Sequence, residues 1–519
     1  MSTSPSMTHV LLKAAESWPE AEALIFGGRR RSFAGLADRA ARIAGGLAGL
    51  GVRKDDVVPI LALNSDRYFE YLFAAGWAGA VVCPLNWRWS AHEIAAALEE
   101  CEARLLLVGD GFETVAHTVS DLLGGKLRLV HLGEAASQSG MENYEEAVAG
   151  SAPLAPAPRN GDDLYGIYYT GGTTGRPKGV MLAHGGVVMS GTVMLVADEA
   201  ARGARYMRCV PMFHYGDTAW SLGTLMRGGA NIILDRFEPA QWLATIEGER
   251  VSATSVVPSM LTALHAFPER ERYDVTGLRQ LTYGGSPISP SLLALARGAF
   301  PSAGFSQGYG MTEFCSNMTI LSARDHLGDD SRLASAGRAN FATRMRIVEP
   351  ETQTPVAAGE RGEVQVCGPQ MMLGYFKRED QTAEAIGGGW LRTGDIGYLD
   401  KDGYLFIVDR LKDMIVTGGE NVYSAEVERA LSSHPAIAEV AVIGIPHERW
   451  GEAVHAVVLL RGGLTATAEG LREHCAERIA RFKCPASVEF VDAMPMSAFG
   501  KISKPDLRAR YWGEGRQVN

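Results

Sequence analysis

The sequence lacks a surplus of positive charge. Its 50 lysines and arginines stand against 60 aspartates and glutamates, so the formal net charge is −10. Nucleic acids and anionic membranes are held by a basic face, and this balance argues against general affinity for either. A small phosphate-bearing ligand is still compatible with it, because a few backbone N–H groups and one lysine can hold such a ligand.

Cysteines are few and form no pattern. The seven are scattered, odd in number and never spaced C-x-x-C, which argues against a disulfide framework and against a zinc site. A reducing compartment fits this usage better. The first residues, Met1 to Lys13, lack the basic start and apolar core of a signal peptide. We therefore expect a cytoplasmic protein.

The sequence also has no uncharged run long enough to cross a membrane. The longest, Tyr71 to Trp87, is interrupted by Gly76, Gly79 and Pro84, whereas a span needs about 20 mostly apolar residues. The run predicts a buried helix followed by a strand, and we expect no transmembrane segment.

Apolar and charged residues occur at ordinary frequencies, 46% and 21%, which excludes a disordered or fibrous chain. Glycine is the exception: 60 of the 519 residues are glycine, about 12% against a typical ~7%. This surplus indicates many tight turns and loops in which a ligand can approach the backbone. The length suggests about three domains or lobes of roughly 150 residues.

Helix and strand patterns alternate along most of the chain. Ser90 and Glu93 form a capping box that opens a helix. Further strands are predicted over Arg104–Val108, Val251–Val257 and Leu278–Tyr283, and further helices over Pro239–Glu247 and Pro290–Arg297. This repetition predicts an α/β protein whose parallel sheets are covered by helices, with ligands at the carboxyl ends of the strands.

The last part of the chain predicts a smaller α+β unit. Its expected strands are Asp413–Val416, Ile437–Ile443, Glu452–Leu460 and Ser487–Val491, and its expected helices are Ser424–Leu431 and Ala468–Ile479. We place a domain boundary near Asp409, so that residues 1–408 form a large domain and residues 409–519 a small one.

A segment rich in glycine and threonine carries the strongest chemical signal. It runs from Tyr169 to Gly179 as YTGGTTGRPKG, and its N–H groups, hydroxyls and one lysine suit a polyphosphate. It is not a Walker A loop, because Pro177 precedes Lys178 and Gly179 follows it, where that motif has glycine and serine or threonine. A flexible surface hairpin is the alternative interpretation.

Three further segments hold groups that a nucleotide needs. Gly308–Glu313 offers a tyrosine face that can stack a base, a hydroxyl, and a carboxylate that can hold Mg²⁺. Thr393–Asp395 and Asp409–Asp413 contain aspartates of the kind that accept the two hydroxyls of a ribose. Read alone, the first could be a strand end with a core tyrosine, and the others turn residues or a solvated charge cluster.

Together these segments resemble a known family, the adenylate-forming superfamily of acyl-CoA synthetases, peptide-synthetase adenylation domains and beetle luciferases. The matching segments, in the family's order, are Tyr169–Gly179, Gly308–Glu313, Thr393–Asp395, Asp409–Asp413, Gly418–Asn421 and Gly500–Lys501. The resemblance spans nearly the whole chain and is closest to the fatty-acid and aryl-acid CoA ligases. It implies a β-barrel-like lobe in the large domain and a mobile small domain.

The resemblance also implies a role for each matching residue. The residues expected at the β- and γ-phosphates of ATP are Thr170, Gly171, Gly172, Thr173, Thr174, Gly175 and Lys178. Those expected at the adenine and α-phosphate are Gly284, Gly285, Ser286, Gly308, Tyr309, Gly310, Met311 and Thr312, with Tyr309 stacked on the base. Thr170 and Glu313 would lie at the metal. Asp395 would hold the ribose, with Arg410 and Ile407 beside the nucleoside.

The implied reaction explains why these residue types are needed. A carboxylate is a weak nucleophile facing a tetra-anionic nucleotide, so the first barrier is largely charge repulsion and alignment. Mg²⁺ and Lys501 would neutralise charge on the α-phosphate and on the departing pyrophosphate. Thr312, Glu313 and His214 are the other catalytic candidates. The alternative for Lys501 is an exposed tail lysine, like its neighbour Lys504.

Two half-reactions in one pocket require an exchange of parts. In the family, the small domain turns about a hinge after adenylation, and Asp409 matches the hinge position. Gly418 and Gly419 would let the thin pantetheine arm of coenzyme A pass beside the backbone. That this pair merely ends a strand is the alternative.

Two positions bear on the acid. Phe213–His214 falls where amino-acid-activating relatives have Phe-Asp, and a histidine cannot supply the fixed negative charge that pairs with an ammonium. Gly308 falls where malonate-activating relatives carry an arginine, so we expect an open, uncharged space there. The expected acid is a monocarboxylate with an apolar body, alkyl or aryl. Its expected pocket is His214, Tyr215, Val257, Met260, Gly308 and Met311, although His214 could instead be a satisfied core histidine.

The leading hypothesis is an acid–CoA ligase that uses ATP, Mg²⁺ and coenzyme A and forms AMP and pyrophosphate. A second hypothesis keeps adenylation and delivers the acyl group to a carrier-protein thiol or to oxygen. A third is a nucleotide sensor without chemistry, against which the joint presence of Lys501, Glu313 and Asp395 speaks. The chain could also form a homodimer.

Overall fold

The computed structural model describes residues 5–133, 141–149, 151–170, 177–197, 203–328, 330–418, 420–496 and 502–512. These residues form two compact units. Among them, the first unit takes those up to 170, from 177 to 345 and from 366 to 391, and the second takes those from 346 to 365 and from 392 onward.

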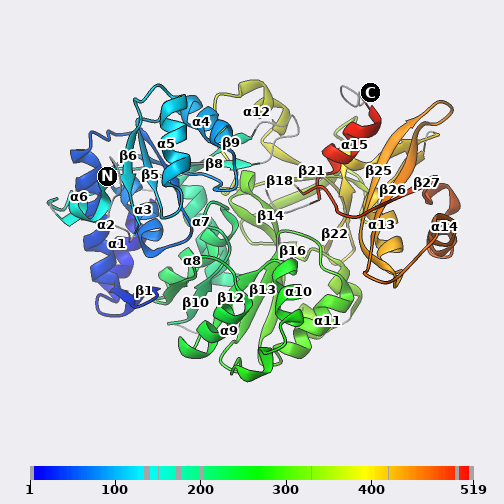
Figure 1. Cartoon of the computed structure of the whole chain (residues 1–519), viewed down its shortest axis with the longest axis horizontal. Coiled ribbons are helices and arrows are strands. Elements are labelled where there is room, and N and C mark those ends of the chain that lie inside the picture. The colour runs from blue at the N-terminus through cyan, green and yellow to red at the C-terminus, as the bar shows by residue number, and fades with distance from the viewer. Residues whose placement is uncertain are drawn as a thin grey trace. The chain divides into compact units, whose positions relative to one another are not determined.

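The first unit contains two large sheets (Figure 1). One has eight strands in the order β19-β9-β8-β4-β3-β5-β6-β7. Its strands are β3 (Val57–Leu61), β4 (Val81–Pro84), β5 (Leu105–Val108), β6 (Arg128–His131), β7 (Glu142–Asn143), β8 (Leu164–Thr170), β9 (Lys178–Ala183) and β19 (Gly374–Tyr375). The neighbours from β8 to β7 pair in parallel, and β9 returns antiparallel along β8. Strands β4 and β5 are apolar and fully buried, as expected of strands covered on both faces.

The other sheet has nine strands in the order β16-β15-β14-β13-β12-β10-β11-β1-β2. They are β1 (Glu22–Phe26), β2 (Arg29–Ser32), β10 (Arg205–Arg208), β11 (Ala230–Ile233), β12 (Ala253–Val256), β13 (Gln280–Gly284), β14 (Gly304–Met311), β15 (Ser316–Leu321) and β16 (Arg338–Ala339). In this order, the neighbours from β14 to β1 pair in parallel, whereas β15 folds back antiparallel along β14. The predicted parallel sheets are therefore confirmed.

Helices connect these strands. Those of the first unit are α1 (Met7–Ser17), α2 (Phe33–Gly49), α3 (Asp66–Trp77), α4 (Ala91–Glu100), α5 (Glu113–Leu122), α6 (Tyr144–Ala149), α7 (His184–Ala197), α8 (Gly216–Met226), α9 (Pro239–Gly248), α10 (Pro258–Ala266), α11 (Pro290–Ala299) and α12 (Glu379–Ala385). Helix α4 begins with the predicted capping box: Glu93 N donates to Ser90 Oγ at 3.3 Å, and Ser90 N donates to Glu93 Oε2 at 2.8 Å.

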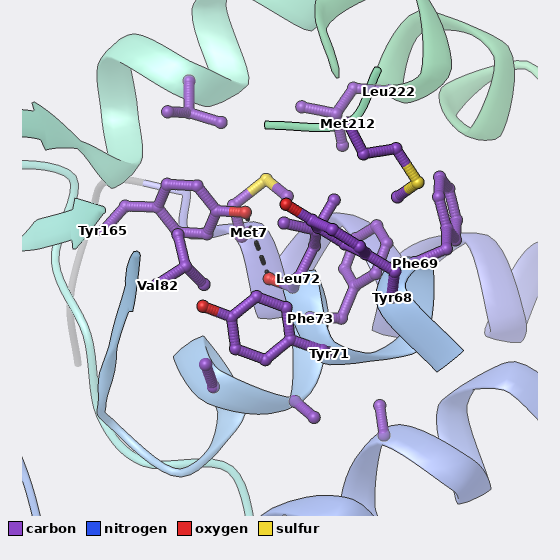
Figure 2. Close-up of a cluster of buried hydrophobic side chains, with 14 of the residues drawn as sticks. Met7, Tyr68, Phe69, Tyr71, Leu72, Phe73, Val82, Tyr165, Met212 and Leu222 are labelled. Carbon is purple, nitrogen blue, oxygen red and sulfur yellow. Dashed lines mark hydrogen bonds between the residues drawn. The ribbon is translucent and has the colours of Figure 1, made fainter. Parts of the chain in front are cut away.

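Helix α3 lies inside the core of the first unit. Every residue of α3 is buried, and Figure 2 shows its Tyr68 and Phe69 among Met212 and Leu222. Helix α3 and strand β4 divide the long uncharged run as predicted. No helix among the described residues combines the length and the apolar character needed to span a membrane.

A third sheet pairs β17-β18-β21-β20, with β22 beside β21. Its strands are β17 (Arg344–Val348), β18 (Gly362–Cys367), β20 (Ile386–Gly387), β21 (Trp390–Leu399) and β22 (Leu405–Arg410). We identify this sheet with the β-lobe that the resemblance implied.

The C-terminal part of the second unit has the predicted α+β composition. Its sheet follows the order β24-β23-β26-β25, with β27 beside β26. The elements are β23 (Ile415–Thr417), β24 (Glu420–Val422), β25 (Ile437–His447), β26 (Gly451–Leu460), β27 (Ser487–Val491), α13 (Ser424–Ser432), α14 (Ala468–Ala476) and α15 (Lys504–Trp512). Strand β23 starts later than predicted, because residues 411–413 form a 3₁₀ turn in which Asp413 pairs with Arg508. The boundary between residues 408 and 409 stays a prediction.

Candidate functional site

The ends of the glycine- and threonine-rich segment lie side by side. Thr170 ends β8 and Lys178 begins β9, and the two residues are register partners in this antiparallel pair. Both side chains are half-buried. The other candidates of this segment, Gly171, Gly172, Thr173, Thr174 and Gly175, lie outside the described residues.

A tyrosine that sequence reasoning missed connects this segment with Glu313. Strand β19 runs antiparallel to β9 and places the Tyr375 ring 5.0 Å from Lys178 Nζ. Tyr375 Oη donates to Glu313 Oε1 at 3.0 Å. Burial, and then the charge of Glu313, raise the pKa of Tyr375, so its phenol remains a neutral donor. Lys178, Tyr375 and Glu313 therefore form one cluster.

The sequence does contain a signal for this tyrosine, in the residue before it. Gly374 has φ +145, and a Cβ there would lie 2.8 Å from Thr382 Cγ2. Thr382 Oγ1 in turn accepts from Tyr375 N at 2.8 Å. A glycine directly before an aromatic residue marks a close backbone approach, but it does not reveal which ligand or side chain lies opposite.

Close packing of neighbouring strands explains the glycines near Tyr309. Gly284 on β13 pairs with Gly308 on β14, and a Cβ on Gly284 would lie 2.5 Å from the Gly308 carbonyl oxygen. A Cβ on Gly310 would collide with the carbonyl oxygen of Ser316. The loop residues Gly285 and Ser286 follow β13, and the 3₁₀ turn of Thr312 and Glu313 follows β14. Adjacent parallel strands thus bring both candidate groups to one sheet edge.

The expected open space beside Gly308 is wrong. A Cβ at this position would collide with the carboxamide of Asn317 on the antiparallel strand β15. Asn317 is 8% exposed, and its Nδ2 lies 3.2 Å from Met194 Sδ on α7. The expectation considered only the missing side chain at position 308, whereas the facing strand fills the space.

His214 lies at the end of a row of aromatic side chains. The rings of Phe213 and His214 lie 4.3 Å apart, and Trp87 meets Phe213 edge-on at 6.2 Å. The Arg88 guanidinium lies 4.6 Å from the Trp87 ring centre. Trp87 and Arg88 come from the loop after β4 and were not candidates in the sequence. His214 itself is half-buried, which is compatible with a residue at the edge of a pocket.

The other expected pocket residues divide into two groups. Val257, directly before α10, lies 3.5 Å from the Cβ position of Gly285, and Met311 ends β14. Met260 packs against the core cluster of α9 to α11. Tyr215 is 1% exposed, its hydroxyl lies 2.7 Å from Ser190 Oγ, and it packs within the core; its assignment to the pocket wall stays a prediction.

In the second unit, two paired strands carry the residues expected at the nucleoside. Asp395 on β21 and Arg410 on β22 are register partners, and Arg410 Nε lies 2.6 Å from Asp395 Oδ1. Ile407 on β22 pairs with Gly397 and is half-buried. Asp395 is 4% exposed, and its ion pair with Arg410 orients its carboxylate.

Asp409, the expected hinge residue, is 5% exposed. Its carboxylate accepts from Arg410 N at 2.7 Å, Ser424 Oγ at 3.1 Å and Ala425 N at 3.4 Å. Burial raises the pKa of Asp409, and the charge of Lys504 acts in the opposite direction. The carboxylate is therefore bound to the first turn of α13.

Of the two glycines expected beside coenzyme A, only Gly418 lies within the described residues. Gly418 has φ +60, and its N–H donates to the Trp450 carbonyl oxygen at 2.9 Å. Gly419 and Lys501 lie outside the described residues. Met496 and Ile502, on either side of the segment with Lys501, form an antiparallel bridge.

A second group in the first unit has atoms that could hold a metal. Asp110, Glu113 and His131 each offer a ligand atom within 4.8 Å of the others. His131 Nε2 lies 3.2 Å from an oxygen of each carboxylate. A hydrogen bond between His131 Nε2 and Glu113 Oε1 accounts for one of these contacts without a metal.

Known proteins resemble this chain over nearly its full length. The family described as "AMP-binding enzyme" matches residues 11–376, and the family described as "AMP-binding enzyme C-terminal domain" matches residues 426–501. A feruloyl-CoA synthase of Amycolatopsis sp is 39% identical over 505 residues, covering 96% of this chain and 98% of the relative. A fatty acid–[acyl-carrier-protein] ligase of Streptomyces coeruleorubidus is 34% identical over 521 residues, covering 97% and 96%.

A solved structure agrees with these matches. The o-succinylbenzoate CoA synthetase of Bacillus subtilis, in complex with its acyl-adenylate intermediate, superimposes with a TM-score of 0.85, 30% identity and 100% coverage of both chains. On the matches of both family descriptions and of these full-length relatives, the chain belongs to the AMP-binding, adenylate-forming enzymes.

Proposed function

We propose that this chain is an ATP-dependent acid–CoA ligase. It activates a monocarboxylic acid as an acyl-adenylate, releases pyrophosphate, and then transfers the acyl group to the thiol of coenzyme A. The observation that carries the proposal is the cluster of Lys178, Tyr375 and Glu313 at the paired ends of β8 and β9. It supplies a cation and a buried carboxylate beside a segment whose composition suits a polyphosphate.

The donor set at this cluster fits Mg²⁺. Glu313 is a carboxylate with 8% exposure, Thr170 adds a hydroxyl, and hard cations prefer oxygen ligands. The Tyr375 phenol is neutral, so the negative charge of Glu313 remains for a cation. We assign Glu313 and Thr170 to the metal, which would neutralise charge on the phosphates.

In the first half-reaction, a carboxylate oxygen of the acid bonds to the α-phosphorus of ATP as pyrophosphate leaves. Lys178 would hold the β- and γ-phosphates, Thr312 the α-phosphate, and Lys501 would bridge the acid and the α-phosphate. Asp395 would hold the ribose, with its carboxylate oriented by Arg410. These groups would lower the barrier by placing positive charge and hydrogen-bond donors where the carboxylate of the acid approaches the phosphates of ATP.

In the second half-reaction, the thiolate of coenzyme A attacks the acyl carbonyl carbon and AMP leaves. We propose that residues 409–519 turn about Asp409 between the two steps, and that Gly418 and Gly419 border the pantetheine arm. We also propose a cytoplasmic location, which is supported by the absence of disulfides among the seven cysteines, all within described residues.

The acid site is proposed at His214, Val257, Gly308 and Met311. The aromatic group of Trp87, Phe213 and His214 offers an apolar wall, and the Asn317 carboxamide beside Gly308 offers a neutral polar group. These contacts suit a monocarboxylate with an apolar body. The named relatives include an aryl-acid enzyme and a fatty-acid enzyme, so alkyl and aryl acids both belong in the test.

Delivery to a carrier-protein thiol is the second candidate, because one full-length relative is a ligase of that kind. A panel of alkyl and aryl acids separates the two. Acid-dependent exchange of pyrophosphate into ATP measures adenylation, and AMP release with and without coenzyme A measures transfer. Exchange that coenzyme A does not convert into AMP release would favour the carrier protein. Absence of exchange with every acid would refute both proposals.

A further inference from the structure

Lys504 does not have the solvated position that its place near the C-terminus suggested. Its side chain is 17% exposed. Its Nζ lies 2.7 Å from Ser424 Oγ and 2.7 Å from Glu428 Oε1, both on α13. The comparison of Lys501 with an exposed neighbour is therefore wrong: Lys504 is fixed at the first residue of α15.

A chain of hydrogen bonds leads from this ammonium to the hinge position. Lys504 donates to Ser424 Oγ, and Ser424 Oγ donates to Asp409 Oδ1 at 3.1 Å. The other carboxylate oxygen of Asp409 accepts from Ala425 N at 3.4 Å. Asp409 is 5% exposed, so it has little access to water as an alternative partner.

Electrostatic attraction also links Lys504 to the hinge position. Asp409, Asp413 and Glu428 bring three carboxylates into this part of the second unit. Burial raises the pKa of Asp409 and of Glu428, and the charge of Lys504 acts in the opposite direction at both. At Asp413 the charges of Lys504 and Arg508 outweigh burial, and the pKa is lowered. Asp413 also pairs with Arg508. Removal of Lys504 would leave the buried carboxylate of Asp409 and the half-buried carboxylate of Glu428 with one cation fewer, which is costly.

The other end of the connection lies next to the segment with Lys501. Lys504 follows Lys501 by three residues in the sequence. The preceding residue, Ser503, donates its N–H to the Pro495 carbonyl oxygen at 2.8 Å, and Met496 forms a bridge with Ile502. The described residues on the two sides of this segment are thus paired directly beside Lys504.

We propose that Lys504 is a positioning residue for adenylation. It connects the base of the segment with Lys501, where Met496 and Ile502 form their bridge, through Ser424 to the carboxylate of Asp409, the proposed hinge residue. The inference rests on the proposed function. Lys504 does not touch the reacting atoms; it fixes where the base of the segment lies relative to the hinge. Adenylation, which needs Lys501, should therefore suffer more than thioester formation, which does not.

The test uses the full-length variant Lys504→Met and measures the half-reactions separately. We expect acid-dependent pyrophosphate–ATP exchange to fall about 10²-fold, the usual cost of a misplaced catalytic group. Thioester formation from preformed acyl-adenylate and coenzyme A should stay close to that of the wild type. Lys504→Arg keeps the charge and should recover most of the exchange.

The chain offers a closely matched control in Lys483→Met. Lys483 Nζ lies 2.7 Å from Glu426 Oε1, also on α13. The side chains of Lys483 and Glu426 are 18% and 24% exposed, against 17% and 23% for Lys504 and Glu428. This variant should leave exchange close to the wild-type rate. Ser424→Ala, which breaks the relay without removing a charge, should lower exchange selectively even if Lys504→Met does not fold.

Unchanged exchange in both Lys504→Met and Ser424→Ala would overturn the inference. Equal loss of both half-reactions, without recovery in Lys504→Arg, would also overturn it, because that result describes a general structural role. Both outcomes presuppose that the wild type exchanges pyrophosphate and uses coenzyme A. A wild type that does neither would refute the proposed function itself, so the two failures are distinguishable.

Discussion

Replacing Glu313 with glutamine separates the charge of this side chain from its shape. Glutamine Oε1 can accept the same hydrogen bond from Tyr375 Oη, which is 3.0 Å long in the wild type. The variant loses the charge-assisted part of that bond, about 1 kcal/mol, since bonds to charged groups contribute ~1.5–3 kcal/mol and neutral bonds ~0.5–1.5 kcal/mol. It also avoids burying a charge at 8% exposure. We expect the free energy of unfolding to change by less than about 1 kcal/mol.

The catalytic effect of Glu313→Gln should be much larger. Without the carboxylate, the proposed Mg²⁺ site would lose a ligand and the phosphates would lose part of their charge compensation. We expect pyrophosphate–ATP exchange to fall by about 10²–10³, and the Mg²⁺ concentration for half-maximal exchange to rise. The assay is exchange measured over a Mg²⁺ series, with urea unfolding of the same preparation.

Glu363→Gln is the matched control for this prediction. Glu363 is 3% exposed and accepts a hydrogen bond from Gln365 Nε2 at 3.3 Å, in the third sheet. Its replacement should leave both the exchange rate and the Mg²⁺ dependence unchanged. Wild-type exchange with an unchanged Mg²⁺ dependence in Glu313→Gln would refute the assignment of Glu313 to the metal.

Three other predictions address the proposed catalytic lysine, the proposed acid site and the core. Lys501→Ala should lower exchange by about 10²–10³ and largely spare thioester formation from preformed acyl-adenylate; equal loss of both would contradict its role. Gly308→Ala should reduce the free energy of unfolding by about 1–3 kcal/mol through collision with the Asn317 carboxamide. Adding Asn317→Ala should recover part of the loss, and an additive double-mutant cycle would contradict the contact. His184 is fully buried and accepts from Met7 N at 3.3 Å, and burial lowers its pKa to about 4. Its contribution is therefore complete above pH ~6.5 and is lost as the pH falls toward 4, by about 3 kcal/mol. Urea unfolding at a series of pH values gives the free energy of unfolding as a function of pH. In His184→Asn this free energy should fall less steeply with decreasing pH than in the wild type, and an unchanged pH dependence would contradict the prediction.

Local pattern was enough to predict the elements that position the site. The capping box at Ser90 predicted the start of α4, and the apolar runs predicted β5, β12 and β13, because each signal lies within a few consecutive residues. Glycines at strand ends also led us to expect ligands at the carboxyl ends of the strands, which stays a prediction; in the structure, Gly284 and Gly310 allow neighbouring strands to approach closely.

Residues whose importance depends on a distant partner could not be predicted in this way. Tyr375 matters because β19 pairs with β9, nearly two hundred residues earlier in the chain. Asn317 matters because β15 folds back along β14, where Asn317 pairs with Gly310 and its carboxamide reaches the Cβ position of Gly308. Lys504 looked solvated because its partners, Ser424 and Glu428, are about eighty residues away. None of these contacts leaves a periodic trace in its own segment.

A chain with a negative net charge can bind a negatively charged nucleotide if its acidic side chains near the site have local partners. Glu313 accepts from Tyr375, Asp395 pairs with Arg410, and Asp409 accepts from the start of α13. Arg410 compensates the charge of Asp395, whereas the neutral donors at Glu313 and Asp409 orient their carboxylates and leave the charge in place; all these contacts are far shorter than the ~8–10 Å over which salt screens charge. The net charge of −10 therefore describes the chain as a whole, whereas the proposed binding of a nucleotide depends on these few contacts.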